Sequence, residues 1–170
     1  LSASNFDDKI AWYENDGNET FTPHDITTSA DWANSVYAVD VDSDGDMDVL
    51  SASFGSGEIT WYANDGSESF TPHTINTINT SSFVVFWVHA GDIDGDGDID
   101  VISNDTTWFE NDGNGNFTPH TITTSAGGAR SVYAIDLDGD GDLDVLSDLS
   151  WEDKIVWFEN LRRSEPDEFL

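Results

Sequence analysis

The residues best suited to chemistry are carboxylates gathered in three short runs. Each run has nine residues with Asp at alternate positions, and the runs span residues 40–48, 92–100 and 136–144. Five carboxylates held this close together repel one another strongly unless a cation or bound protons neutralise them. Ca²⁺ takes roughly six to eight oxygen ligands and tolerates an irregular cage. The runs therefore predict three calcium sites.

The position of a residue within its run predicts how it binds the ion. We expect positions 1, 3, 5 and 9 to aim their carboxylates inward, while position 7 offers its backbone oxygen and turns its side chain toward solvent. Gly at position 6 permits the sharp bend that such a loop needs. The predicted side-chain ligands are Asp40, Asp42, Asp44 and Asp48; Asp92, Asp94, Asp96 and Asp100; and Asp136, Asp138, Asp140 and Asp144. The predicted backbone ligands are Asp46, Asp98 and Asp142.

Other cations and other calcium motifs fit the runs less well. Mg²⁺ prefers a compact octahedral shell that keeps its waters, and Zn²⁺ favours His or Cys, which the runs lack. An EF-hand requires Glu at position 12 and a helix on each side. Position 12 here is Ser51, Ser103 or Ser147, and the flanking segments have strand composition. The motif that remains consistent with the runs is a calcium loop inside a β-hairpin.

A repeat of about 48 residues positions the three runs. Trp12, Trp61, Trp108 and Trp157 open near-identical phrases that lie 49, 47 and 49 residues apart. Each unit contains four short β-branched and aromatic stretches divided by turn residues, and none has a helical period. Such a unit is typical of a four-stranded antiparallel propeller blade. We therefore predict an all-β fold of β-propeller blades, as a half-ring or a small propeller, with almost no helix.

The repeat divides the chain into two whole blades between two partial ones. We expect a partial blade at 1–28, blades at 32–78 and 84–124, a partial blade at 130–160 and a C-terminal tail at 161–170. The whole blades have four strands and the partial blades three. Partial blades leave open edges, which proteins normally cover. We therefore expect a homodimer or the remainder of a longer chain to complete the ring, with a small self-closed ring as the alternative.

The overall composition restricts the partners. Asp and Glu number 35 against 5 Lys and Arg, which gives a net charge of −30. A chain this acidic repels nucleic acid and anionic membranes, so neither is an expected partner. The sequence has no apolar run of about 18 residues, so we predict no membrane span. It also has no Cys, and bound metal can take the place of disulfides as a staple.

The repeats resemble the FG-GAP/VCBS family, whose blades build integrin-α-like propellers. The resemblance covers residues 1–160 and rests on the loop Asp-x-Asp-x-Asp-Gly-Asp-x-Asp followed by Val, then Leu or Ile, then Ser, as in Asp136 to Ser147. It implies calcium loops that stabilise blades in a secreted or cell-surface module for adhesion, or for binding protein or carbohydrate. Phe54-Gly55 matches the name motif only once and no Gly-Ala-Pro follows, which weakens the analogy to integrin ligand binding.

The sequence shows no catalytic constellation. His24, His73 and His120 occupy one repeat position, which favours a structural role. Trp87 and His89 stand where other repeats have Ser and Tyr, and they are either ligand contacts or packing variants. There is no nucleophile elbow, phosphate loop or metalloprotease motif. We predict that the chain is not an enzyme; the alternative is a lectin-like or accessory domain of a larger secreted enzyme.

Overall fold

The described part of the chain consists of β-strands joined by turns. A computed structural model describes residues 1–78, 85–125 and 128–161, and these residues contain no helix. The predicted tail, apart from Leu161, lies outside them, as do residues 79–84. The strands are β1 (Ser2–Ser4), β2 (Lys9–Asn15), β3 (Phe21–Thr27), β4 (Ala33–Val39), β5 (Asp48–Ser53), β6 (Glu58–Asn64), β7 (Phe70–Thr77), β8 (Val88–Gly91), β9 (Asp100–Ser103), β10 (Thr107–Asn111), β11 (Phe117–Thr121), β12 (Ala129–Ile135), β13 (Asp144–Leu149) and β14 (Lys154–Phe158).

The strands form four antiparallel sheets of three, four, four and three strands. Their orders are β1-β2-β3, β4-β5-β6-β7, β8-β9-β10-β11 and β12-β13-β14, so every pairing joins strands that follow each other in the chain. This is the up-and-down pattern expected of propeller blades. The predicted all-β fold, with blades of four strands between blades of three, is confirmed.

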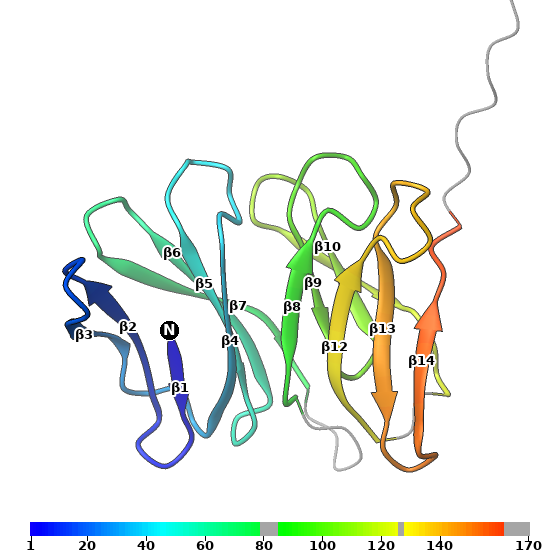
Figure 1. The fold of residues 1–170 in the computed structure, drawn as a ribbon, viewed down its shortest axis with the longest axis horizontal. Coiled ribbons are helices and arrows are strands. Elements are labelled where there is room, and N and C mark those ends of the chain that lie inside the picture. The colour runs from blue at the N-terminus through cyan, green and yellow to red at the C-terminus, as the bar shows by residue number, and fades with distance from the viewer. Residues whose placement is uncertain (79–84, 126–127, 162–170) are drawn as a thin grey trace, which may run out of the picture.

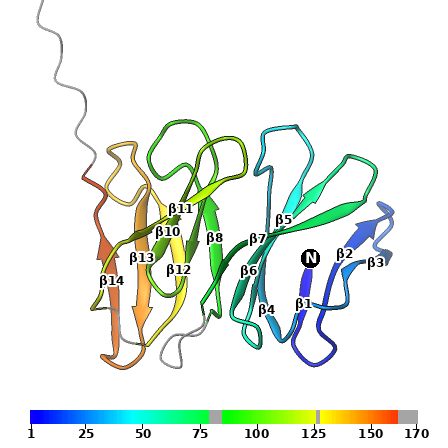
Figure 2. The same ribbon diagram turned by 180° about the vertical axis from the view of Figure 1, so that it is seen from behind.

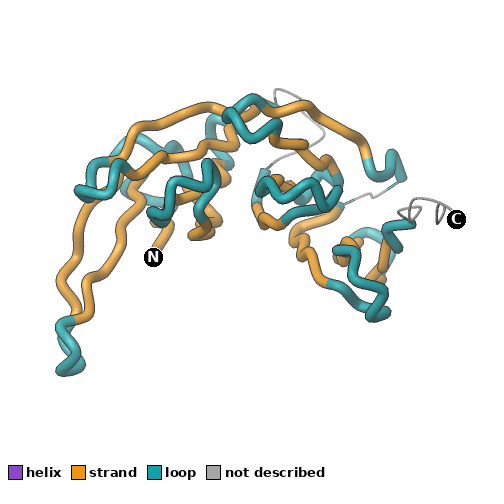
Figure 3. The backbone as a smooth tube through the Cα atoms, turned by 90° about the horizontal axis from the view of Figure 1, so that it is seen from above, coloured by secondary structure: helices purple, strands orange, loops and turns teal. Residues whose placement is uncertain are grey.

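The four sheets stand side by side along an arc. Strand β4 contacts β1 on one side and β8 on the other, and β8 contacts β12. Figure 1 looks onto these first strands, whereas Figure 2, the view from behind, looks onto β7 and β11. Seen from above, the sheets follow one another around an arc that is open on one side (Figure 3). The arc leaves the first and the last sheet with one neighbour each among the described residues.

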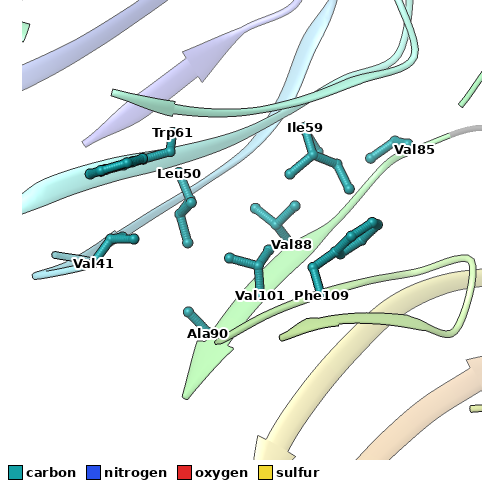
Figure 4. Packing of buried hydrophobic residues seen from close by; sticks show 10 residues of the cluster. Val41, Leu50, Ile59, Trp61, Val85, Val88, Ala90, Val101 and Phe109 are labelled. Atoms are coloured by element: carbon teal, nitrogen blue, oxygen red, sulfur yellow. The ribbon is translucent and has the colours of Figure 1, made fainter. Parts of the chain in front are cut away.

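Apolar side chains fill the space between neighbouring sheets. The largest cluster joins the second and third sheets, where Leu50, Ile59 and Phe109 are fully buried and interdigitate (Figure 4). Burying one such side chain stabilises a fold by about 1.5–3 kcal/mol, so this cluster is a main source of stability. Trp61 lies in the same cluster with 6% of its surface exposed. Trp61, one of the four repeated Trp residues, therefore packs between two neighbouring blades.

The repeated His residues stack on the repeated Trp residues of the neighbouring strand. The ring centroids lie 4.3 Å apart for Trp12 and His24, and 4.6 Å apart for Trp108 and His120. His120 Nε2 also lies 2.6 Å from Glu110 Oε2. His24 and His120 are each held by a ring and a carboxylate of their own sheet, and the His73 ring lies 4.8 Å from that of Trp61. These contacts support the structural interpretation.

His89 occupies the middle of an aromatic row along the first strands. Its ring lies 4.6 Å from Tyr37 on one side and 4.3 Å from Tyr133 on the other. The backbone N–H of Ala134 donates to His89 Nδ1 at 3.3 Å, and burial lowers the pKa of His89. These contacts favour the packing alternative for His89. Trp87, by contrast, is 43% exposed.

Candidate metal centre

The three Asp loops lie along one edge of the arc. They join β4 to β5, β8 to β9 and β12 to β13, which are the first and second strands of their sheets. All three hairpins point upward in Figure 1. The repeat causes this arrangement, because the same connection in successive blades leaves the sheet on the same side. The loops therefore form one acidic edge.

Each loop brings three carboxylates together around a point. The potential ligand atoms in each group lie within 4.8 Å of one another. The groups are Asp40, Asp42 and Asp48; Asp92, Asp94 and Asp96; and Asp136, Asp138 and Asp144. Positions 1 and 3 thus converge in every loop, joined by position 9 in two loops and by position 5 in the other. The remaining predicted side-chain ligands, Asp44, Asp100 and Asp140, stand outside these groups.

Backbone N–H groups within the loop hold the first carboxylate in place. Asp40 accepts hydrogen bonds from the N–H groups of Asp44 at 3.1 Å and of Gly45 at 3.0 Å. The N–H of Gly97 donates to Asp92 Oδ2 at 3.2 Å, and the N–H of Gly141 donates to Asp136 Oδ2 at 3.1 Å. Position 6 is Gly with φ of 97°, 101° and 99° in the three loops, a conformation that other residues rarely adopt. The predicted bend at this Gly is present in all three loops.

The Asp at position 9 has a structural role that the sequence reasoning missed. Asp48, Asp100 and Asp144 are fully buried at the start of the second strand. One oxygen of Asp100 accepts from the N–H of Ile93 at 2.9 Å, and the other accepts from the N–H of Asn111 at 2.8 Å. The other two loops repeat this pattern. The carboxylate therefore fastens its loop to the third strand, and each oxygen keeps a second lone pair that can face a cation.

A hydrogen-bonding arrangement that recurs at the end of the third strand in two sheets also links neighbouring loops. The side-chain amide of Asn111 donates to Ile99 O in its own loop and to Val41 O in the preceding loop, both at 3.1 Å. Asn160 repeats the arrangement, donating to Leu143 O at 3.1 Å and to Ile93 O at 2.8 Å. Each of these amides therefore ties two Asp loops together. The signal for this linkage in the sequence is the Asn that follows each repeated Trp by three residues.

The side chains at position 7 lie against a turn of their own sheet. Asp46 and Asp98 are half-buried. A Cβ placed on Gly66 would come 2.5 Å from Asp46 Oδ2, and one on Gly113 would come equally close to Asp98 Oδ2. These two glycines belong to the Asn-Asp-Gly turns that join the third and fourth strands. Position 7 thus lines the junction of the loop and this turn.

The electrostatics of the loops favour a bound cation. Burial raises the pKa of Asp100 to about 6, although backbone hydrogen bonds oppose the shift. The pKa of Asp42 is raised first by burial and then by the charges of Asp48 and Asp44, and burial raises the pKa of Asp94. Asp92 Oδ1 is a buried oxygen without a hydrogen-bond partner among the described residues. An all-oxygen donor set with an unpaired buried carboxylate oxygen fits Ca²⁺.

A comparison with protein-family models identifies the repeats. The model of the FG-GAP-like repeat matches residues 1–51, 40–103 and 103–147. The chain belongs to the FG-GAP-like repeat family. Each match extends to or across an Asp loop, so the loops are part of the repeat that defines the family. A search of curated protein sequences gave no significant match for this FG-GAP-like chain.

A solved lectin shares the fold. This solved structure is of a lectin from Agrocybe aegerita, and it concerns the specific recognition of non-reducing terminal N-acetylglucosamine by that lectin. It superposes with a TM-score of 0.57 at 18% sequence identity, over 81% of this chain and 40% of the lectin chain. The FG-GAP-like chain thus spans less than half the length of this neighbour.

The described residues of the chain include no helix long and apolar enough to cross a membrane.

Proposed function

We propose that the chain is a non-catalytic, calcium-stabilised propeller module that binds protein or carbohydrate outside the cell. The observation that carries the proposal is the threefold repetition of converging carboxylates, one of which keeps a buried oxygen unpaired. Calcium at extracellular, roughly millimolar levels suits weak, rigidifying sites of this kind. The module works as part of a closed ring, completed by a second copy or by further blades.

Calcium contributes to folding because it binds the assembled loop and not the unfolded chain. A ligand at about 100 times its Kd stabilises the folded state by about 2.7 kcal/mol per site. Three such sites supply a large fraction of the stability of a chain this size, since whole domains are stable by only about 5–15 kcal/mol. The carboxylates that repel in the empty loop become the ligands that hold it closed.

The test is a pair of melting curves, in CaCl₂ and in EDTA, for the wild type and Asp42→Asn. We expect calcium to raise the melting temperature of the wild type strongly. The variant should melt lower than the wild type in calcium, where it has lost a charged ligand. In EDTA it should melt at the same temperature or higher, because it removes a charge whose burial, and then its repulsion by Asp48 and Asp44, raise the pKa of Asp42.

Asp7→Asn is the matched control, because Asp7 is exposed in the β1–β2 turn, outside the Asp loops. It should follow the wild type in both conditions. A wild-type melting temperature that does not respond to calcium would contradict the proposal. So would a loss in Asp42→Asn that is equal with and without calcium, because that result indicates a structural role only.

Carbohydrate is the ligand class that one cavity favours. A cavity of about 340 Å³ lies between the third and fourth sheets, and the residues that line it include Trp108, Phe158 and Leu143 together with the acidic residues Asp94 and Glu159. Such a mixture of apolar walls and a few polar groups is typical of small-ligand sites. Rings can cover the apolar face of a sugar, while carboxylates accept its hydroxyl groups. Asp94 also belongs to a metal group, so we expect calcium to affect binding here.

A glycan array that includes terminal N-acetylglucosamine, the sugar named for the Agrocybe lectin, tests this ligand class. Binding should weaken in Glu159→Gln, which alters the cavity, and persist in Glu19→Gln, which lies in an exposed turn. No binding to any glycan in calcium would leave protein as the ligand class. Binding that Glu159→Gln leaves unchanged would place the sugar elsewhere.

A further inference from the structure

We propose that the free faces of the first and last sheets bind each other between two copies of the chain, so that two arcs close one ring. The inference deepens the proposed ring and rests on it, but it requires neither metal in the loops nor sugar in the cavity. It names the partner, a second copy, and the two surfaces that meet.

The free face of the fourth sheet repeats a surface that is buried elsewhere in the same chain. In the second sheet, Ile59 is fully buried and Trp61 is 6% exposed. The residues at the same repeat positions in the fourth sheet are Ile155, which is 83% exposed, and Trp157, which is 42% exposed. The side chains are of the same type at both places. Within the described residues, the fourth sheet lacks two things that cover this face in the second sheet: a neighbouring sheet, and a fourth strand carrying the His that packs on Trp61.

The strand register shows that these residues share one side of the sheet. Trp61 pairs with Leu50 in the second sheet, and Trp157 pairs with Leu146 in the fourth. On the other side of the fourth sheet, Val132 and Val145 pack against the third sheet and are buried. Since side chains alternate along a strand, Ile155 and Trp157 point away from the third sheet.

The first sheet presents the complementary kind of face. In the second sheet, Tyr62 is 6% exposed and Phe70 packs with it against the first sheet. Their counterparts at the same repeat positions in the first sheet are Tyr13, which is 44% exposed, and Phe21, which is 58% exposed. These rings have no sheet to pack against among the described residues. They are the surface that would meet a preceding blade.

Within the chain, the two kinds of face always meet each other. The face with Trp61 packs against Phe109 and Phe117 of the third sheet, which hold the repeat positions of Tyr62 and Phe70. The interface between two copies continues this rule, with Trp157 of one copy facing Tyr13 and Phe21 of the other. The contact is heterologous, and two such contacts close a ring if the rotation fits.

The shape and size of the arc suit a ring of two copies. The two free faces lie at opposite ends of an arc that is open on one side (Figure 3). The chain covers 40% of the Agrocybe lectin chain, so two arcs come close to that length. The net charge of −30 on each chain opposes association, and added salt or calcium weakens this repulsion.

Light scattering after size-exclusion chromatography tests the inference in CaCl₂ with moderate salt. We expect the wild type at twice the chain mass of 18.7 kDa. Ile155→Asp on the last sheet and Phe21→Glu on the first should each fall to the chain mass. Both residues are exposed in the single chain, so a circular dichroism spectrum unchanged from the wild type shows that the variants fold. Phe6→Asp is the control, because Phe6 is fully exposed in a turn and should leave the double mass unchanged.

Mixing the two variants separates head-to-tail pairing from its alternative. The unaltered first-sheet face of Ile155→Asp can bind the unaltered last-sheet face of Phe21→Glu, so the mixture should recover part of the double mass. A dimer that survives Phe21→Glu but not Ile155→Asp would mean that two last sheets pair with each other, and it would overturn the inference. A wild type that stays at the chain mass at every concentration would also overturn it. Calcium-dependent melting of such a single chain would still uphold the calcium proposal, which distinguishes the two failures.

Discussion

Replacing Asn111 with Leu tests whether neighbouring Asp loops are held together through one side chain. Asn111 is fully buried, and its amide donates to Val41 O in one loop and to Ile99 O in the next, both at 3.1 Å. Leu has a similar volume and no donor, so both carbonyl oxygens lose their partner. A buried polar group left unpaired costs about 1–3 kcal/mol, so we expect Asn111→Leu to lower the free energy of unfolding by about 2–5 kcal/mol.

Asn64→Leu is a matched control for this substitution. Asn64 holds the same repeat position in the second sheet, and within the described part of the chain its amide donates only to Met47 O at 3.1 Å. Met47 is exposed, so water can replace the lost donor and the cost should be about 1 kcal/mol or less. Each Asn also accepts a hydrogen bond through its side-chain oxygen from the backbone N–H of the turn Gly two residues later, at 3.2 Å in both sheets. Both substitutions remove this bond, so its loss cancels in the comparison.

Urea denaturation in EDTA measures the two costs without metal, and repeating it in CaCl₂ measures the effect on calcium binding. We expect Asn111→Leu to reduce the stabilisation by calcium more than Asn64→Leu does, because it loosens two loops and not one. Equal destabilisation by the two substitutions would refute the reasoning, since the bond from Asn111 to Val41 would then contribute nothing.

Two further predictions concern His89 and Gly66. Burial lowers the pKa of His89, so below the ordinary His value of about 6.5 the unfolded chain binds more protons, and stability falls as the pH is lowered toward the folded pKa. His89→Tyr should reduce the loss of melting temperature between about pH 7.5 and about pH 5.5, and a difference between variant and wild type that is the same at both pH values would contradict this. Gly66→Ala should destabilise more than Gly17→Ala, because both glycines have positive φ but only Gly66 lies against a carboxylate, that of Asp46. Thermal melts of the two variants compare them directly, and equal losses would show that the contact with Asp46 is unimportant.

The regular part of this fold was accessible from the sequence because it repeats. Four copies of one Trp phrase set the period, and the alternating Asp runs placed a hairpin loop between the same two strands of successive sheets. A pattern that recurs at a fixed spacing reports one local structure several times, so a chance match in one copy is outweighed by the others. The number and order of the strands in each sheet followed from that period.

The linkage between loops was not accessible, because it depends on contacts across blades. The amide of Asn111 reaches Val41 O, 70 residues away in the sequence, and no local pattern announces this bond. The buried Asp at position 9 is a similar case. Its place in the Asp run suggests a ligand, and only the packed sheet shows that Asp100 also accepts from the backbone of Asn111.

The charge of the loops bears on the proposed assembly of two copies. Fifteen of the 35 acidic residues lie in the three loops, and the loops share one edge of the arc. Closing a ring of two copies brings two such edges onto one side of a single particle, which increases the repulsion that a net charge of −30 per chain already causes. Under the proposed function, Ca²⁺ in the loops would lower that charge where it is densest and would stiffen the loops that Asn111 and Asn160 tie together. Calcium should therefore strengthen the association of the arcs even though the surfaces that meet are apolar.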